Sequence, residues 1–154
     1  MTTAPEEDIA RRARWSRSID KSCNLVRVAA MDEDKLCTMI LAAAFRVHSR
    51  LGPGLLESVY ERVLAYELTK GGLSVEVQKP VPIIYDEIAF DEGYRADLIV
   101  EKRILLELKS IEKLLPVHAK QVLTYIRLAN LRLGYLVNFG EAQLKTGIKR
   151  LVNG

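Results

Sequence analysis

The chain has 154 residues, of which 49% are hydrophobic and 28% are charged, and its formal net charge is +3. This balance excludes a fully disordered chain and a collagenous fibre, and the length fits a single folded domain. The two cysteines, Cys23 and Cys37, are too few for a disulfide scaffold or for a tetrahedral zinc site made of thiolates. The small positive charge does not by itself argue for a nucleic-acid-binding surface.

The first 31 residues differ in composition from the rest of the chain. Four arginines fall between positions 11 and 17, and large aliphatic residues are scarce before Leu25. We therefore expect residues 1–31 to form a flexible basic arm and residues 32–154 to form the folded domain, with Met31 as an alternative start. The longest apolar run, Met39–Phe45, is too short to span a bilayer, and no secretory signal is visible, so we expect a cytoplasmic protein.

Two helices are predicted at the start of the folded domain. Apolar residues recur at steps of three and four over 32–51, and either Asp32 or Asp34 could cap the start. A Leu-Gly-Pro-Gly sequence then ends this helix. The second helix is predicted over about 55–70, and its apolar stripe consists of Leu56, Val59, Val63 and Leu64.

The pattern then changes to one that indicates strands. Apolar and polar residues alternate over 73–78, and two prolines soon afterwards confine the continuation to an edge strand or an irregular strand. Residues 86–93 are polar and predict a turn. Two apolar runs follow, at 94–100 and 104–108, and the three residues between them are enough only for a hairpin turn.

The last part of the domain returns to a helix and then to a strand. Pro116 suits the first turn of a helix at about 117–130, and His118 is expected to belong to the start of that helix. A strand is predicted at 133–139, and the tail at 144–152 is either a short strand or a helix. The predicted order of elements is therefore helix, helix, three strands, helix and strand.

Three charged residues interrupt the apolar hairpin and define a candidate site. Asp97 lies in the first run, and Glu107 and Lys109 share one face of the second. Because positions equidistant from a hairpin turn pair across it, Asp97 is expected beside Glu107. Two carboxylates so close repel each other, and a divalent cation would relieve this. We therefore predict a Mg²⁺ site, for which Mn²⁺ is a substitute, held by Asp97, Glu107 and the backbone carbonyl of Leu108.

Each of these residues also has a structural interpretation. Glu107 and Lys109 could form an ordinary pair on a solvent-exposed strand. Gln121 and Tyr125, spaced i, i+4, could place an amide over the carboxylates, or could be a solvated residue and a core tyrosine with its hydroxyl capped. Glu57, in the first turn of the second helix, either supports the metal site directly or through water, or only stabilises the helix dipole.

One segment resembles the signature of a known family. Gly54–Tyr60 fits the pattern Gly-x-x-Glu-x-x-Tyr of a family of small prokaryotic proteins that is placed in the PD-(D/E)XK nuclease superfamily. The resemblance covers about residues 32–153. It also includes the segments Gly93–Leu98, Glu107–Lys109, His118–Gln121 and Asn138–Gly140.

The resemblance implies a restriction-endonuclease-like α/β core, in which a mixed central β-sheet is flanked by α-helices. It implies that Glu57 is the acid carried by a helix, that Asp97 is the metal-binding aspartate, and that Glu107 and Lys109 form the E-x-K pair. It also implies that Gln121, together with Tyr125, matches the helical Gln-x-x-x-Tyr of some members. Ala96 replaces the proline of the superfamily's name.

These observations predict a Mg²⁺-dependent nuclease that hydrolyses phosphodiester bonds of nucleic acid, with DNA as the expected substrate. The alternative is a catalytically inactive module of the same fold that binds nucleic acid or a protein partner, which the small net charge favours. A homodimer is compatible with the small size. The residues expected to act in hydrolysis are Asp97, Glu107, Lys109, Gln121 and Glu57. Those expected to contact nucleic acid are Lys113, Lys120, Tyr125, Arg127 and Arg132.

Overall fold

The computed structural model describes residues 30–154, so the basic arm predicted for residues 1–31 lies almost wholly outside the described residues. The chain divides into two units after Leu36. None of the described helices is long and apolar enough to cross a membrane. The elements in chain order are α2 (Glu33–Leu51), α3 (Glu57–Lys70), β1 (Val75–Tyr85), β2 (Ile88–Val100), β3 (Ile104–Lys109), α4 (Pro116–Leu128), β4 (Leu133–Asn138), the 3₁₀ helix η1 (Leu144–Gly147) and β5 (Ile148–Val152).

The helices begin close to their predicted positions, but the buried face of α3 differs from the prediction. The carboxylate of Asp32 accepts the N–H of Asp34 at 2.6 Å, so Asp32 caps α2. In α3 the predicted stripe is confirmed at Leu64 and wrong at Leu56, which is 74% exposed and precedes the helix. The face that packs inward is shifted along the helix and consists of Tyr60, Leu64 and Leu68.

The strands form one mixed sheet of five, in the order β1-β2-β3-β4-β5. Only β3 and β4 run parallel, since α4 carries the chain back before β4 begins, and the other neighbours are antiparallel. The tail that the sequence left open forms η1 followed by β5. The expected edge position of the proline-containing strand is confirmed, because β1 is at one end of the sheet.

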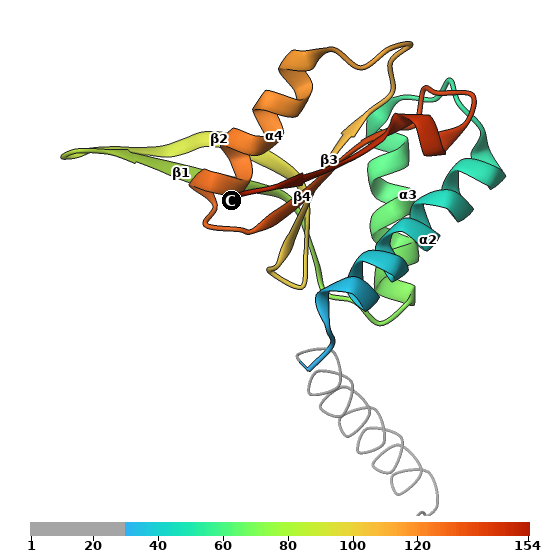
Figure 1. The fold of residues 1–154 in the computed structure, drawn as a ribbon, viewed down its shortest axis with the longest axis horizontal. Coiled ribbons are helices and arrows are strands. Elements are labelled where there is room, and N and C mark those ends of the chain that lie inside the picture. Colours follow the sequence, from blue (N-terminus) through green and yellow to red (C-terminus); the bar gives the residue numbers. More distant parts are fainter. Residues whose placement is uncertain (1–29) are drawn as a thin grey trace, which may run out of the picture. The chain divides into compact units, whose positions relative to one another are not determined.

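The segment 86–93 is not the turn that its polarity predicts. The turn has only two residues, and β2 already begins at Ile88. The distal half of the β1–β2 hairpin projects beyond the rest of the sheet (Figure 1), and its residues are mostly exposed. Polar side chains in that half of the hairpin stay in water and lose no hydration free energy. A polar segment of an exposed hairpin can therefore be strand as well as turn.

Helices cover both faces of the sheet, as predicted. Figure 1 shows α3 and α4 on opposite sides of the strands. Their packing explains why β3 and β4 are buried almost throughout, unlike a strand with one wet face. On the α4 side the buried cluster consists of Val81, Ala96, Ile99, Leu105, Val122, Ile126 and Leu136.

The ring of Tyr60 fixes the start of α3 against the end of β4. Its hydroxyl donates to the carbonyl of Gly52 at 2.5 Å and accepts the N–H of Leu55 at 3.1 Å. The ring stacks on Phe139, with centroids 4.6 Å apart and planes 8° apart. Gly54 has a φ of +102°, which a glycine adopts without strain. The loop before α3 is thus held by a buried aromatic pair.

A second buried side chain holds the segment that follows β3. Asn138 accepts the N–H groups of Ile111 and Gly140 at 3.0 and 3.1 Å, and its amide donates to the carbonyl of Ile111 at 2.8 Å. A Cβ at Gly140 would lie 2.2 Å from that carbonyl oxygen, so only glycine fits. The segments that follow β3 and β4 are therefore held together by hydrogen bonds to the buried Asn138.

We expect Tyr60→Phe to lower the free energy of unfolding by about 1–2 kcal/mol, because the Gly52 carbonyl and the Leu55 N–H lose their partner. Urea unfolding measures this. The matched control is Tyr66→Phe on the same helix, where the tyrosine is 63% exposed and the change is expected to be small. Equal losses for the two variants would contradict the assignment.

Candidate active site

Asp97 and Glu107 lie opposite each other across the β2–β3 hairpin. The last paired residues of this ladder are Leu98 and Leu106, and one further step along both strands reaches Asp97 and Glu107. At that step Oδ2 of Asp97 accepts the N–H of Leu108 at 2.8 Å. The predicted adjacency of Asp97 and Glu107 is therefore confirmed. Where the β2–β3 ladder ends, the carboxylate of Asp97 takes the place of a backbone carbonyl as hydrogen-bond acceptor.

Glu107 and Lys109 form a largely buried pair. Nζ of Lys109 donates to Oε1 of Glu107 at 2.8 Å, and the two side chains are only 16% and 6% exposed. The alternative of a solvent-exposed pair is thus wrong, because helices cover both faces of this interior strand. Among the buried side-chain atoms of the described residues, Oε2 of Glu107 is left without a hydrogen-bond partner.

Glu57, in the first turn of α3, lies near Asp97 and Lys109. Glu57 accepts a hydrogen bond from the backbone of Ser110 and is influenced by the charges of Lys109 and Asp97. The hydroxyl of Ser110 donates to the carbonyl of Leu55 at 2.6 Å, which ties the loop before α3 to the end of β3. The structural and functional interpretations of Glu57 are therefore compatible, since one residue occupies the first helical turn and lies near the predicted site.

Two residues of this cluster were not among the predicted site residues, namely Glu61 and Gln78. Gln78, on β1, donates from its amide nitrogen to Oδ1 of Asp97 at 3.2 Å and also to Oε2 of Glu61. The spacing of Glu61 from Glu57 by four residues was a usable signal, because such residues share a helix face. Gln78 gave no signal, because it looks like any polar residue of an alternating strand.

The burial of these acids dominates the electrostatics of the site. Burial raises the pKa of Glu107 to about 7, and the charge of Asp97 adds to the rise while Lys109 opposes it. Burial also raises the pKa of Asp97, against the hydrogen bond from Leu108. Burial alone would lower the pKa of Lys109, but its hydrogen bond with Glu107 and the nearby acids raise it overall. The protonated Lys109 thus lies among carboxylates that do not readily ionise at the same time.

Helix α4 approaches the site through a stacked pair of tyrosines. The rings of Tyr94 and Tyr125 lie 3.7 Å apart, and the hydroxyl of Tyr94 donates to the carbonyl of Tyr125 at 2.6 Å. Burial raises the pKa of Tyr94, and the charges of Tyr125 and Glu107 add to the rise. Gln121 donates from its amide to the hydroxyl of Tyr125. Tyr125 thus has the packed ring and capped hydroxyl of its structural interpretation.

The histidine in the first turn of α4 has a structural position. Nδ1 of His118 accepts the N–H of Leu115 at 3.1 Å, so the side chain caps the helix start, as expected. Such a contact satisfies a backbone donor that has no partner within the helix. His118 therefore needs no part in the chemistry of the acidic cluster.

The basic residues predicted to contact nucleic acid fall at two ends of the sheet. Lys113 is exposed in the loop between β3 and α4, and Lys120 and Arg127 are exposed on α4. Arg132 directly precedes β4, and the parallel register places that point beside Ile104, at the start of β3. Arg132 is therefore about 20 Å along the strands from Lys109. The structure does not bring Arg132 to the acids.

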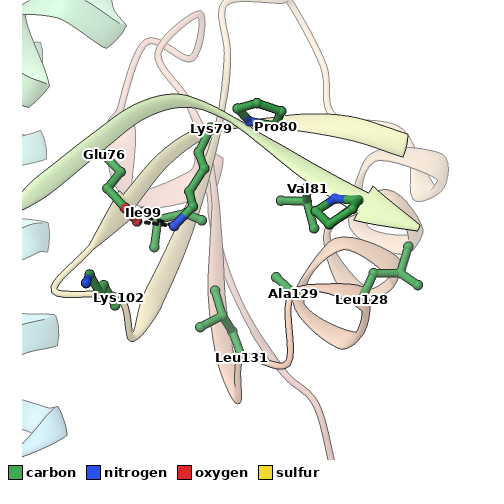
Figure 2. Close-up of a pocket in the computed structure, with 10 residues that line it drawn as sticks. Glu76, Lys79, Pro80, Val81, Ile99, Lys102, Leu128, Ala129 and Leu131 are labelled. Carbon is green, nitrogen blue, oxygen red and sulfur yellow. Dashed lines mark hydrogen bonds and ion pairs between the residues drawn. The ribbon is translucent and has the colours of Figure 1, made fainter. Parts of the chain in front are cut away.

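A cavity of about 370 Å³ lies away from this cluster, between the β1–β2 hairpin and the end of α4. Its walls are mainly apolar and include Val81, Ile99 and Leu131. Figure 2 shows the ion pair of Lys79 and Glu76, which are 2.8 Å apart, at its wall. None of the predicted site residues lines it. The hollow and the acidic cluster are separate features of the described domain.

Comparison with known proteins gives one result. A family model described as the PD-(D/E)XK nuclease superfamily matches residues 34–151. The chain has no significant match among curated proteins or among solved structures. The match spans nearly every described element, and the mixed sheet with helices on both faces agrees with the restriction-endonuclease-like core that the sequence predicted.

We expect Glu107 to make the metal-free protein less stable as the pH rises. Its pKa is about 7 in the folded protein against 4.5 for the free side chain, so folding favours its protonated form between these values. Glu107→Gln stays neutral, and we expect it to be more stable than the wild type at pH 8 by roughly 1–3 kcal/mol, with little difference near pH 4.

Urea unfolding in EDTA across this pH range measures the effect. The control is Glu87→Gln, at the exposed turn of the β1–β2 hairpin, which should keep the pH dependence of the wild type. A Glu107→Gln variant whose stability follows the wild type at every pH would contradict the burial of this carboxylate.

Proposed function

Because the chain belongs to the PD-(D/E)XK nuclease superfamily, we propose that it is a Mg²⁺-dependent nuclease that hydrolyses phosphodiester bonds of DNA. Membership supports nuclease chemistry as a class. The metal, the substrate and the residues that act are inferred from the acidic cluster at the end of β3. The proposed set consists of Asp97, Glu107, Lys109, Gln121 and Glu57.

The observation that carries the proposal is the unpartnered Oε2 of Glu107. Buried polar atoms are nearly always hydrogen-bonded, since burying one without a partner is costly. The other oxygen of Glu107 already accepts from Lys109, and the nearby charge of Asp97 further disfavours ionisation. A divalent cation fits this donor set, because it would give Oε2 a partner and offset the repulsion between the two carboxylates.

Asp97, Glu107 and the backbone carbonyl of Leu108 would hold the ion. The N–H and C=O of one residue in an extended strand point to the same side, and the N–H of Leu108 reaches Asp97. The donors are all oxygens, which suits Mg²⁺ and also Mn²⁺. Within residues 30–154 no three His, Cys, Asp or Glu side chains are close enough to hold a metal together. This favours a link to Glu57 through water over a direct one.

Lys109 would act as a hydrogen-bond donor and a positive charge. Its raised pKa keeps it protonated at neutral pH, so it does not accept the proton of the attacking water. An ammonium has three protons, and one is engaged by Glu107, so others are available for a water or a phosphate oxygen. A bound divalent ion would supply Lewis-acid polarisation of the phosphate and lower the pKa of water. Gln121 would assist on the phosphate side.

The exposed cations of α4 and of the loop before it would bind the phosphate backbone. Lys113, Lys120 and Arg127 are exposed, and such contacts give salt-sensitive binding without reading the base sequence. Residues 30–154 of each chain contain one acidic cluster, so cutting both strands of a duplex at one position calls for two copies. The proposal therefore includes a homodimer.

A catalytically inactive module remains the second candidate, and one observation favours it. The acids within residues 30–154 do not form a cluster of three close enough to bind a metal. The net charge of +3 is also small for a protein that grips duplex DNA. In this alternative the domain would bind nucleic acid or a protein partner, and the buried acids would have no catalytic role.

We expect Asp97→Asn and Lys109→Met to separate metal binding from hydrolysis. Asp97→Asn removes a ligand, so Mn²⁺ binding should be lost in calorimetry, together with Mg²⁺-dependent cleavage of plasmid and single-stranded DNA. Lys109→Met keeps both carboxylates, so Mn²⁺ binding should persist while the cleavage rate falls by about 10²-fold or more.

The control for these variants is Lys70→Ala, in the last turn of α3, which should cut DNA at the wild-type rate. Cleavage that survives in Lys109→Met would overturn the role of the lysine. A wild type that neither binds Mn²⁺ nor cuts any of the DNA substrates would support the inactive module.

We also expect Lys120→Ala to weaken DNA binding equally for unrelated sequences. Loss of one phosphate contact should reduce the slope of log affinity against log salt by about one, and Lys120→Ala with Arg127→Ala by about two. Fluorescence anisotropy with a labelled duplex in EDTA measures binding without cleavage. Slopes equal to that of Lys70→Ala would show that α4 does not contact the phosphates.

A further inference from the structure

Gln78 has a backbone conformation that is unusual inside a strand. Its φ is +49°, in the left-handed region that residues other than glycine avoid. Its neighbours Val77 and Lys79 pair with Leu98 and Ala96 on β2, and Gln78 itself is absent from the ladder. A residue other than glycine is strained in this conformation, so the surrounding contacts must maintain it.

The contacts that accompany this conformation are those of the side chain. The amide nitrogen of Gln78 donates to Oδ1 of Asp97 and to Oε2 of Glu61. The other oxygen of Asp97 accepts the N–H of Leu108. The two oxygens of Asp97 thus accept hydrogen bonds from the two strands that flank β2, one from β1 and one from β3. These two contacts fix the orientation of the carboxylate.

An amide suits this position for an electrostatic reason. Its NH₂ group has two hydrogens, so one neutral side chain can donate to two carboxylates. A lysine in its place would add a positive charge and compete with a metal ion. Gln78 therefore keeps Glu61 and Asp97 close together without cancelling their negative charge, which is what a cation site requires.

We propose that Gln78 is a positioning residue of this site, which orients Asp97 and draws Glu61 toward it for binding a divalent cation. The inference rests on the proposed metal-dependent function. It assigns Gln78 no contact with substrate. Hydrogen-bond partners of metal ligands typically change metal affinity by 10–100-fold when they are removed.

The test uses Gln78→Gly, because glycine adopts a positive φ without strain and lacks only the side chain. We expect the Mn²⁺ dissociation constant of the full chain to rise at least ~10-fold in calorimetry. The midpoint of urea unfolding should stay near that of the wild type, because relief of backbone strain offsets the lost hydrogen bonds. Asn tolerates the same φ but is one methylene shorter, so Gln78→Asn should fall between the wild type and Gln78→Gly.

The controls are Val77→Ala, on the same strand, which should bind Mn²⁺ like the wild type, and Asp97→Asn, which should not bind it. If the wild type binds Mn²⁺ and Gln78→Gly binds it equally well, the role of Gln78 is wrong and the proposed function stands. If the wild type fails to bind Mn²⁺, both are wrong. If affinity and unfolding midpoint fall in step in Gln78→Gly and Gln78→Asn, Gln78 has only a structural role.

Discussion

The structure depends on one unfavourable arrangement, which is the burial of several carboxylates around a single ammonium at the end of an interior strand. Burial raises the pKa values of Asp97 and Glu107, and one oxygen of Glu107 has no partner among the described residues. Lys109 relieves this only in part, since it engages the other oxygen. A core made only for stability would place apolar residues here, because a buried ion pair is seldom better than well-packed hydrophobic side chains. This cost in stability is the reason that we propose a role for the cluster in binding a cation and a phosphate.

The segment Gly54–Tyr60 has two halves with different physical roles. Glu57 lies near the acids, whereas the ring of Tyr60 stacks on Phe139 and its hydroxyl holds the loop. Asn138 and Gly140 do the same for the chain beyond β3. These buried contacts fix where α3 begins relative to the end of β3, and that distance decides whether Glu57 can act with Asp97. The stacking and the chemistry are thus linked, because a helix start that moved would carry its acid away from the sheet.

The sequence predicted the part of the site that depends on local geometry. Alternation along a strand placed Glu107 and Lys109 on one face, and counting outward from a tight turn placed Asp97 beside Glu107. It failed where local rules do not apply. The polar segment 86–93 belongs to a projecting hairpin, where exposure removes the usual meaning of polarity. Arg132 lies at the far end because β4 runs parallel to β3 and begins beside Ile104.

Gln78 shows why the remainder of such a site is hidden from sequence. Its contribution needs β1 to pair with β2, α3 to cross the same strands, and its own backbone to leave the extended region. None of these follows from the residues around it, and a glutamine between Val77 and Lys79 fits a solvated strand equally well. Glu61 was closer to being predicted, since it lies one turn from Glu57, but its approach to Asp97 depends on how α3 packs on the sheet. Acids in a strand can be found in the sequence because they interrupt an apolar pattern, whereas a neutral glutamine that hydrogen-bonds to them interrupts no pattern. Its signal is the strained backbone, which only coordinates reveal.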